Sequence, residues 1–221
     1  MKLKVLSDKA KTAIEAEFPK YPDKRSVLLA ALHIAQKEVG YLSEAAMVDV
    51  AELLELTPVQ VYDVATDQWV LGPPLPLPNN HGMAAGVNGK IYLIGGQTTD
   101  LSEGPYVDTV YELDPARGTW VEKARMPTAR SSGVAVVHDG KIYVAGGRPP
   151  RGSDFAVYNP GSDTWQVLPN LPSQRNHLTG AAIDGRIHVV GGRLGQGLSA
   201  QMTTVHEIFD PQTGGWTTAA P

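Results

Sequence analysis

Apolar residues recur with two different periods along the chain, and the change falls near residue 60. Up to that point they return every three or four positions, which is typical of helices that bury one face. Three or four short helices are therefore expected, and their starts are indicated by Ser7, Arg25, Ser43 and Thr57. Gly40 is placed to end the second helix, because glycine accepts the left-handed conformation of a helix C-cap without strain.

Beyond residue 70 the apolar residues form short runs separated by glycine and proline, and the chain repeats itself. Four tryptophans mark the repeat, at separations of 51, 45 and 51 residues: Trp69, Trp120, Trp165 and Trp216. Three glycine pairs each begin 26 residues after a tryptophan: Gly95 and Gly96, Gly146 and Gly147, Gly191 and Gly192. A period near 50 residues is typical of β-propeller blades. The length variation falls after each glycine pair, which predicts a surface loop there.

Each repeat also contains the turn signals of a four-stranded sheet. The first signal is a two-residue hairpin turn, Asn-Gly or Asp-Gly, at residues 88–89, 139–140 and 184–185. The second is an aspartate or asparagine six residues before the tryptophan: Asp63, Asp114, Asn159 and Asp210. We expect these residues to brace turns by accepting backbone hydrogen bonds, and the tryptophans to cover the interfaces between sheets. A structural role is also expected for the glycine pairs.

The stretch TPVQVYDVATDQW, residues 57–69, fits either half of the chain. Thr57, Pro58 and Gln60 form a helix-start signal, which predicts a helix through Tyr62. Asp63 precedes Trp69 by six residues, however, as in every later repeat. Valine, tyrosine and threonine tolerate both conformations, so tertiary context must decide. We favour a strand from about residue 61, because the repeat then gains two strands of a further blade.

The order of glycine pair, aromatic residue with Asp or Asn, and tryptophan resembles the kelch repeat over residues 61–221. The resemblance implies four-stranded antiparallel blades in a β-propeller, a fold used mostly for binding and sometimes for catalysis. We therefore expect an α+β protein of two modules: a small helical bundle at 1–60 and a partial kelch-type β-propeller of about three and a half blades at 61–221. Closed propellers typically have about 4 to 8 blades. A truncated reading frame, self-association of two copies that completes the propeller, and a marginally stable open arc all remain open.

Residues 3–66 resemble the N-terminal helical region of the thioredoxin-like, two-iron ferredoxin subunit of bacterial NADH:quinone oxidoreductase, which is respiratory complex I. The resemblance is carried by YPDKRSVLLAALHIAQKEVGYLS and LLELTPVQVYDVAT. In that family the chain continues into a thioredoxin-like domain whose cysteines hold a [2Fe-2S] cluster. This sequence departs from the family after Thr66 and contains no cysteine, so no iron–sulfur cluster is expected and the fusion is chimera-like.

Composition narrows the remaining classes of function. The formal net charge is −4, which gives no indication of nucleic-acid binding. The absence of cysteine excludes disulfides, thiolate metal sites and cysteine nucleophiles. No segment has the roughly 18 apolar residues of a membrane span or the pattern of a signal peptide, so a cytoplasmic protein is expected. No cofactor is predicted.

Four arginines are the candidate ligand-binding residues. Arg130 and Arg175 share one repeat position, where Asn79 is the counterpart, and Arg148 and Arg193 share another, which Gln97 fills. Near blade-edge loops these guanidinium groups could bind a carboxylate through paired hydrogen bonds. Solvation, or bonds to backbone carbonyls, is the alternative. His81 and His177 also share a position, which Ser132 fills, but a third ligand is not evident, so no metal site is predicted.

The sequence pattern contains no nucleophile placed beside a base and no recurring pair of carboxylates. It therefore indicates no catalytic site. The leading hypothesis is therefore a non-catalytic protein that binds a protein partner or a small acidic ligand through its propeller loops. One alternative is a fragment of the ferredoxin-subunit type that docks on the NADH-binding subunit without its cluster. A second is a kelch-class sugar-active enzyme, such as an epimerase or an oxidase.

Overall fold

The computed structural model describes residues 6–21, 27–40, 46, 49–50, 53, 59–63, 68–73, 75–99, 105–195 and 197–220. The chain divides into two compact units, Met1–Pro74 and Leu75–Pro221. Each unit is described separately below. No helix in the described part of the chain is long and apolar enough to cross a bilayer.

The first unit begins with short helices, as the apolar period predicts: α1 (Asp8–Glu15), the 3-10 turn η1 (Phe18–Lys20) and α2 (Leu28–Val39). The Ser7 hydroxyl caps α1 by accepting a hydrogen bond from the Ala10 N–H at 3.2 Å. Gly40 ends α2 in the left-handed conformation, with φ of 82°, as expected. The predicted helix starts at Arg25, Ser43 and Thr57 lie outside the described residues.

The small core of this unit consists of apolar side chains that are buried on α1, α2 and the segment after them. They include Ile14, Val27, Ala31, Ala35, Ala46 and Val50, each fully buried. Because they are spaced three or four residues apart along each helix, they lie on one face of that helix.

The ambiguous stretch is a strand at the residues the structure describes. β1 (Val59–Asp63) pairs antiparallel with β2 (Gln68–Gly72). The strand interpretation is thus confirmed, and a helix running through Tyr62 is wrong. Tyr62 lies opposite Trp69 in this hairpin. The compact units place the hairpin in the first unit, so assigning residues from 61 onward to the propeller rests on sequence register and stays a prediction.

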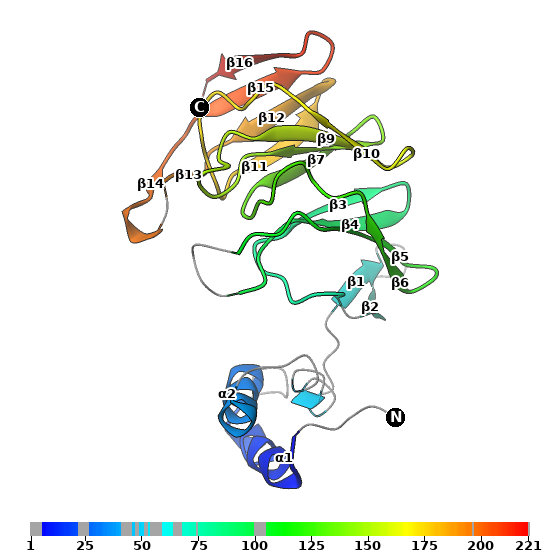
Figure 1. Ribbon diagram of the computed structural model, residues 1–221, viewed down its shortest axis with the longest axis vertical. Helices are drawn as coiled ribbons and strands as arrows, with labels where there is room; N and C mark the ends of the chain where they lie inside the picture. The colour runs from blue at the N-terminus through cyan, green and yellow to red at the C-terminus, as the bar shows by residue number, and fades with distance from the viewer. Residues whose placement is uncertain are drawn as a thin grey trace. The chain divides into compact units, whose positions relative to one another are not determined.

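The second unit contains three four-stranded antiparallel sheets, here called blades A, B and C (Figure 1). Blade A comprises β3 (Met83–Val87), β4 (Lys90–Ile94), β5 (Val110–Asp114) and β6 (Thr119–Lys123). Blade B comprises β7 (Val134–His138), β8 (Lys141–Ala145), β9 (Phe155–Asn159) and β10 (Thr164–Val167). Blade C comprises β11 (Thr179–Ile183), β12 (Arg186–Val190), β15 (His206–Asp210) and β16 (Gly215–Ala219).

Strands follow chain order within each blade, so every connection inside a blade is between neighbours. The innermost strands β3, β7 and β11 lie side by side, with blade B between the other two. In blade C the loop between β12 and β15 holds a two-stranded ribbon of β13 (Arg193–Leu194) and β14 (Gln201–Met202), with the 3-10 turn η3 (Gly197–Ser199) between them. The expected partial propeller is confirmed, with three complete blades in the second unit. The β1–β2 hairpin is a separate two-stranded sheet.

The repeat signals fold alike in all three blades. The first residue of each hairpin turn has positive φ: 52° at Asn88, 47° at Asp139 and 48° at Asp184. This is the conformation that a type I′ turn requires. In each blade the tryptophan lies opposite the third strand's aromatic or leucine: Leu113 and Trp120, Tyr158 and Trp165, Phe209 and Trp216. The β1–β2 hairpin has the same register.

The expected Asx turns between third and fourth strands are confirmed in the three blades, whereas the turn after Asp63 lies outside the described residues. The side-chain Oδ1 of Asp114 accepts from the Ala116 N–H at 3.0 Å, and Asn159 and Asp210 make the corresponding bonds to Gly161 and Gln212. A short polar side chain that bonds the backbone two residues ahead fixes the turn locally.

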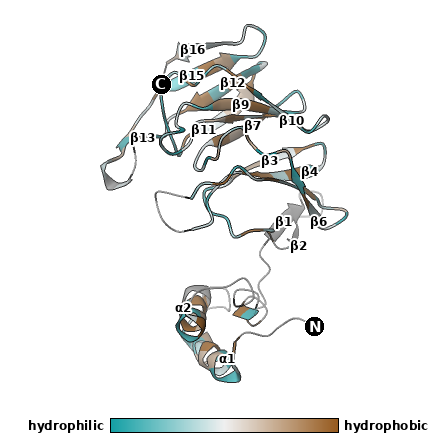
Figure 2. Ribbon diagram, viewed as in Figure 1, coloured by the Kyte–Doolittle hydropathy of each residue, from teal (hydrophilic) through white to brown (hydrophobic). Residues whose placement is uncertain are grey.

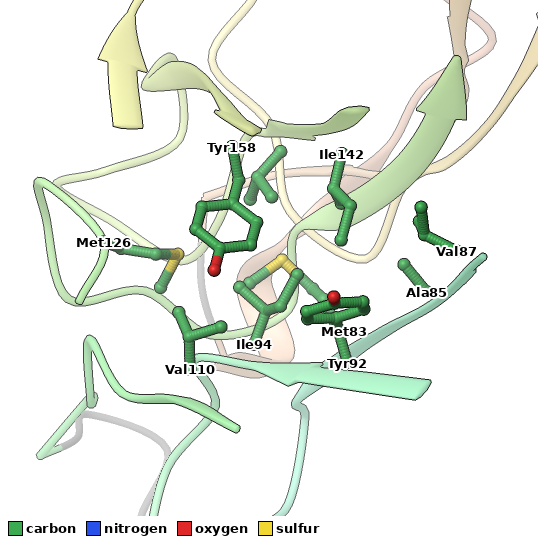
Figure 3. Packing of buried hydrophobic residues seen from close by; sticks show 10 residues of the cluster. Met83, Ala85, Val87, Tyr92, Ile94, Val110, Met126, Ile142 and Tyr158 are labelled. Atoms are coloured by element: carbon green, nitrogen blue, oxygen red, sulfur yellow. The ribbon is translucent and has the colours of Figure 1, made fainter. Parts of the chain in front are cut away.

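The core lies between blades, where apolar strand faces meet (Figure 2). Between A and B, Tyr158 and Ile142 point toward Val110, Ile94 and Tyr92 (Figure 3). Between B and C, a second cluster contains Tyr143, Phe155, Ile187, Val189 and Phe209. Burying one such side chain contributes about 1.5–3 kcal/mol. The two interfaces therefore provide the main stabilisation of this unit.

Two tryptophans join neighbouring blades. The indole N–H of Trp165 donates to the Ala124 carbonyl at 2.8 Å, and that of Trp216 donates to the Pro169 carbonyl at 2.9 Å. Both acceptors follow the last strand of the preceding blade. The indoles therefore pack at the interface and also satisfy their polar N–H there.

Candidate functional site

The candidate site lies where two recurring segments meet: the residues just before each innermost strand and the residue after each glycine pair. Asn80 pairs with Gln97 in blade A, and Asn176 pairs with Arg193 in blade C. In blade B the equivalent segments are joined by the Arg148 N–H, which donates to the Ser131 carbonyl at 2.9 Å. These backbone bonds bring together segments that are far apart in the sequence.

The glycine pairs make this approach possible. Gly96 has φ of 104°, and a Cβ built there would lie 2.1 Å from Asn79 Oδ1. The Gly96 N–H donates to the Arg130 carbonyl at 2.8 Å, and the Gly147 N–H donates to the Arg175 carbonyl at 3.0 Å. In blades A and B the glycine pair therefore lets the blade bond the start of the next one.

Arg130 and Arg175 are buried, with 1% and 0% exposure. Arg130 Nη1 donates to the Asp154 carbonyl at 2.7 Å, and burial lowers its pKa to about 10. Arg175 Nη1 donates to the Val205 carbonyl at 2.7 Å, and its Nη2 forms an ion pair with Glu207 at 2.7 Å. Burial lowers the pKa of Arg175, which the Glu207 carboxylate partly offsets.

These two arginines and their counterpart in blade A, Asn79, each make one further bond of the same kind. Asn79 Nδ2 donates to the carbonyl of the first paired glycine, Gly95, at 2.7 Å. Arg130 and Arg175 direct Nη1 at the equivalent carbonyls of Gly146 and Gly191, at 3.4 and 3.1 Å. The position therefore braces the glycine pair of its own blade. Neither guanidinium faces solvent, and we leave both out of the proposed ligand site.

His81, Ser132 and His177 form the middle of the candidate site. Their backbones all have positive φ, 52°, 59° and 52°, a conformation that non-glycine residues rarely adopt. The Ser132 N–H donates to the His81 carbonyl at 2.9 Å, and the His177 N–H donates to the Ser132 carbonyl at 2.7 Å. Unusual backbone held in place by its surroundings is found often at functional sites.

Asparagine side chains fix the state of both histidines. His81 Nδ1 lies 2.8 Å from Asn80 Oδ1, and His177 Nδ1 lies 2.5 Å from Asn176 Oδ1. An amide oxygen only accepts, so each Nδ1 carries the hydrogen and each neutral ring keeps its lone pair on Nε2. The rings meet edge to face, with centroids 5.3 Å apart.

The second arginine position lies beside these rings. Arg148 Nη2 is 3.2 Å from His81 Nε2, and its Nη1 donates to Gln97 Oε1 at 3.0 Å. Among the described residues, the guanidinium of Arg193 forms no hydrogen bond or ion pair. Arg148 and Arg193 both lower the pKa of the two histidines.

Electrostatics keep the histidines neutral near pH 7. Burial is the largest cause of the lowered pKa of His81, followed by the charges of Arg148 and Arg193. The pKa of His177 falls to about 4, through burial and then through Arg193, Arg148 and His81. The result is a site of two fixed cations and two neutral rings, which favours an anion. We call His81, Gln97, Arg148, His177 and Arg193 the central site.

The structure thus brings together residues that the sequence pattern presents separately. Arg148 and Arg193 lie near His81 and His177, whereas Arg130 and Arg175 lie inside their blades. The supporting residues Asn80, Ser131 and Asn176 were missed. Their signal was available, because the three occupy one repeat position directly before His81, Ser132 and His177.

The chain belongs to the kelch-repeat family: its model "KLHDC2/KLHL20/DRC7 Kelch-repeats domain" matches residues 80–221. A second model, "Thioredoxin-like [2Fe-2S] ferredoxin", matches residues 14–67. The chain is therefore a chimera of a ferredoxin-subunit segment and kelch repeats, as the two resemblances indicated. The full sequence has no cysteine, so the thiolate ligands of a [2Fe-2S] cluster are missing and the residues do not fit that group.

Curated relatives agree with both assignments. The chain is 45% identical over 71 residues to N-acetylneuraminate epimerase of Pasteurella multocida (strain Pm70), covering 31% of this chain and 19% of the relative. It is 34% identical over 93 residues to alpha-scruin of Limulus polyphemus, covering 42% of this chain and 10% of the relative. It is 47% identical over 53 residues to an NADH-quinone oxidoreductase subunit of Rhizobium meliloti (strain 1021), covering 24% of this chain and 32% of the relative.

A solved structure shares the fold. It is titled "Structure of YjhT", with a TM-score of 0.59 and 18% sequence identity over 70% of this chain and 56% of that one. The chain thus spans about half of that structure and about a fifth or less of the kelch relatives named above.

Proposed function

We propose that the protein is a non-catalytic kelch binding protein that holds a carboxylate of a protein partner or small acidic ligand at the central site. The observation that carries the proposal is Arg193, whose guanidinium has no bonding partner among the described residues while it lies near two neutral histidines. Membership of the kelch-repeat family supports an interaction role.

The chemistry of the central site favours a carboxylate over a cation. Two guanidinium groups supply planar sets of N–H donors, which match the two oxygens of a carboxylate. Arg148 contacts two uncharged groups here, the amide of Gln97 and the ring of His81. A carboxylate would add negative charge beside both arginines, and charge-assisted hydrogen bonds of this type contribute about 1.5–3 kcal/mol each.

Calorimetric titration of the full chain tests the proposal, with a glutamate-rich peptide in one arm and N-acetylneuraminate in the other. We expect Arg193→Ala and Arg148→Ala to weaken binding about tenfold or more. Arg117→Ala is the matched control, because the Arg117 side chain is 82% exposed on the β5–β6 turn of blade A. Binding that both central variants leave unchanged would overturn the proposal. The two arms separate a protein ligand from a free acidic ligand.

A sugar-active enzyme is the second candidate, favoured by the 45% identity to an N-acetylneuraminate epimerase. His177 keeps an unprotonated Nε2 at neutral pH, so it could accept a proton from a hydroxyl of an acidic sugar held by Arg193. Proton NMR of N-acetylneuraminate with the full chain tests this candidate. Stereoisomer interconversion that is lost in His177→Gln would support it, and no acceleration over buffer would exclude it.

The respiratory alternative rests on the ferredoxin-subunit match at residues 14–67. In this proposal the segment, which carries no [2Fe-2S] cluster, docks on an NADH-binding subunit. Capture of that subunit by the full chain, and loss of capture when residues 1–58 are deleted, would support docking. Self-association that completes a propeller and a cytoplasmic location are also proposals, and they rest on the sequence pattern.

A further inference from the structure

His188 of β12 and His206 of β15 are neighbours on blade C, away from the central site. They replace aromatic or aliphatic residues that the repeat places at the same positions. In blade B the equivalents are Tyr143 and Phe155, which stack at 6.1 Å, and both are buried. Both histidines are only partly buried. The pair is thus a departure from the pattern of the blade and is reachable from solvent.

The two rings point nitrogens at each other. His188 Nδ1 lies 2.9 Å from His206 Nε2, and the ring centroids are 5.2 Å apart. Two imidazole nitrogens bound to one transition metal ion lie about 2.0–2.1 Å from it. At a right angle, such bonds place the nitrogens about 2.9 Å apart. The pair therefore already has the separation of two adjacent ligands in a square-planar or octahedral site.

A backbone carbonyl sets the tautomer of one ring. His206 Nδ1 is 3.0 Å from the Ala220 carbonyl oxygen, which only accepts, so Nδ1 carries the hydrogen and Nε2 has a lone pair. Metal-bound histidines almost always donate their second N–H in this way, which orients the ring. Without a metal, His188 Nδ1–H donates to His206 Nε2. Metal binding requires His188 to carry its hydrogen on Nε2 instead, a change of tautomer through solvent, and it requires the rings to turn so that both lone pairs point at the metal.

We propose that His188 and His206 form a two-histidine site for a divalent transition metal ion, with water at the remaining positions. Imidazole nitrogen suits Cu²⁺, Ni²⁺ and Zn²⁺, and Cu²⁺ binds most tightly in the general order of affinities. Among the described residues no cluster of three or more His, Cys, Asp or Glu side chains could hold a metal, so the protein supplies two ligands here. The site is therefore open to water or to a donor atom from another molecule.

Cu²⁺ titration of the full chain tests the proposal, followed by calorimetry and electron paramagnetic resonance. The test variant is His188→Tyr with His206→Phe, which installs the residues of blade B at the equivalent positions. We expect the wild-type spectrum to show two imidazole nitrogens, and the double variant to bind at least about tenfold more weakly. The controls are His138→Gln, because His138 lies 3.3 Å from the Asp139 carboxylate, and His177→Gln, because His81 and His177 are a second histidine pair with ring centroids 5.3 Å apart.

Equal Cu²⁺ affinity in wild type and the double variant would overturn the proposal. So would a one-nitrogen spectrum, which would indicate an ordinary hydrogen bond between the rings. His206→Gln is a second variant for the case that the double variant misfolds, checked by circular dichroism. It should reduce the spectrum to a single nitrogen while the blade stays folded.

Discussion

Two arginine positions of the same repeat, 18 residues apart (148−130 and 193−175), differ in environment. Arg130 and Arg175, before the innermost strand, lie inside the blades and bond backbone carbonyls. Arg148 and Arg193, after the glycine pair, lie beside the histidines of the central site. The difference shows that the repeat position decides whether an arginine enters the blade, because the two members of each pair have the same environment. The first pair should therefore matter for stability and the second for binding.

The largest effect on stability is expected at Arg175. Arg175→Met removes one partner of a buried ion pair and leaves the Glu207 carboxylate, 2% exposed, without its charge partner. Such a loss costs about 3–5 kcal/mol in the free energy of unfolding. Urea unfolding followed by tryptophan fluorescence measures it. A loss below about 1 kcal/mol would show that the ion pair is not buried as described.

Arg130→Met should have the next largest effect. It removes the 2.7 Å bond to the Asp154 carbonyl, but no carboxylate is left unpaired in the blade. A hydrogen bond to a charged group contributes about 1.5–3 kcal/mol, so the loss should be smaller than for Arg175→Met. The same unfolding experiment measures it. The reverse order of the two variants would contradict the comparison.

His177 should make stability fall in acid. Its pKa is about 4 in the folded chain, below the ordinary value of 6.5, because burial and the charges of Arg193, Arg148 and His81 disfavour the charged ring. Between pH 6.5 and 4 the unfolded chain therefore binds a proton that the native chain does not, and native stability decreases as the pH falls through that window. Urea midpoints from pH 7 to 4 measure the effect.

His177→Gln should flatten that pH dependence. Residual dependence is expected from His81, whose pKa is lowered in the same direction. NMR titration of the His177 ring gives a direct check. A midpoint near 6.5 would show that neither burial nor the arginine charges lower the pKa of the ring.

The smallest effect on stability is expected at Arg193. Its guanidinium has no bond or ion pair among the described residues, so Arg193→Ala should change the free energy of unfolding by less than about 0.5 kcal/mol. The same variant should weaken carboxylate binding about tenfold. Loss of stability comparable to that of Arg130→Met would mean that both arginine positions are structural.

The fold was largely predictable because its signals are local. The Asn-Gly and Asp-Gly turns, the Asx turns and the fixed interval between tryptophan and glycine pair each depend on a few adjacent residues, and together they define a blade. The stretch at Val61 was ambiguous because its residues suit helix and strand alike. The structure resolved it through pairing with β2, which no local signal shows.

The site was less predictable because it combines residues from three blades. Periodicity identified Arg148, Arg193, His81 and His177, but their proximity depends on the backbone bonds between blades at Ser132. The buried ion pair of Arg175 requires Glu207, a partner 32 residues away with no counterpart in the other repeats. Tyr111 and Ala156 occupy its equivalent positions, so the repeat alone gave no reason to expect the ion pair.

β1 and β2 hold Tyr62 opposite Trp69, the pairing that the third and fourth strands use in each blade, although Tyr62 also lies within the ferredoxin-subunit match. The residues at the junction of the two family matches therefore form a hairpin with the register of a blade. Inserting one residue in β1 would exchange the two faces of the hairpin, so the junction should accept substitutions more readily than changes in length.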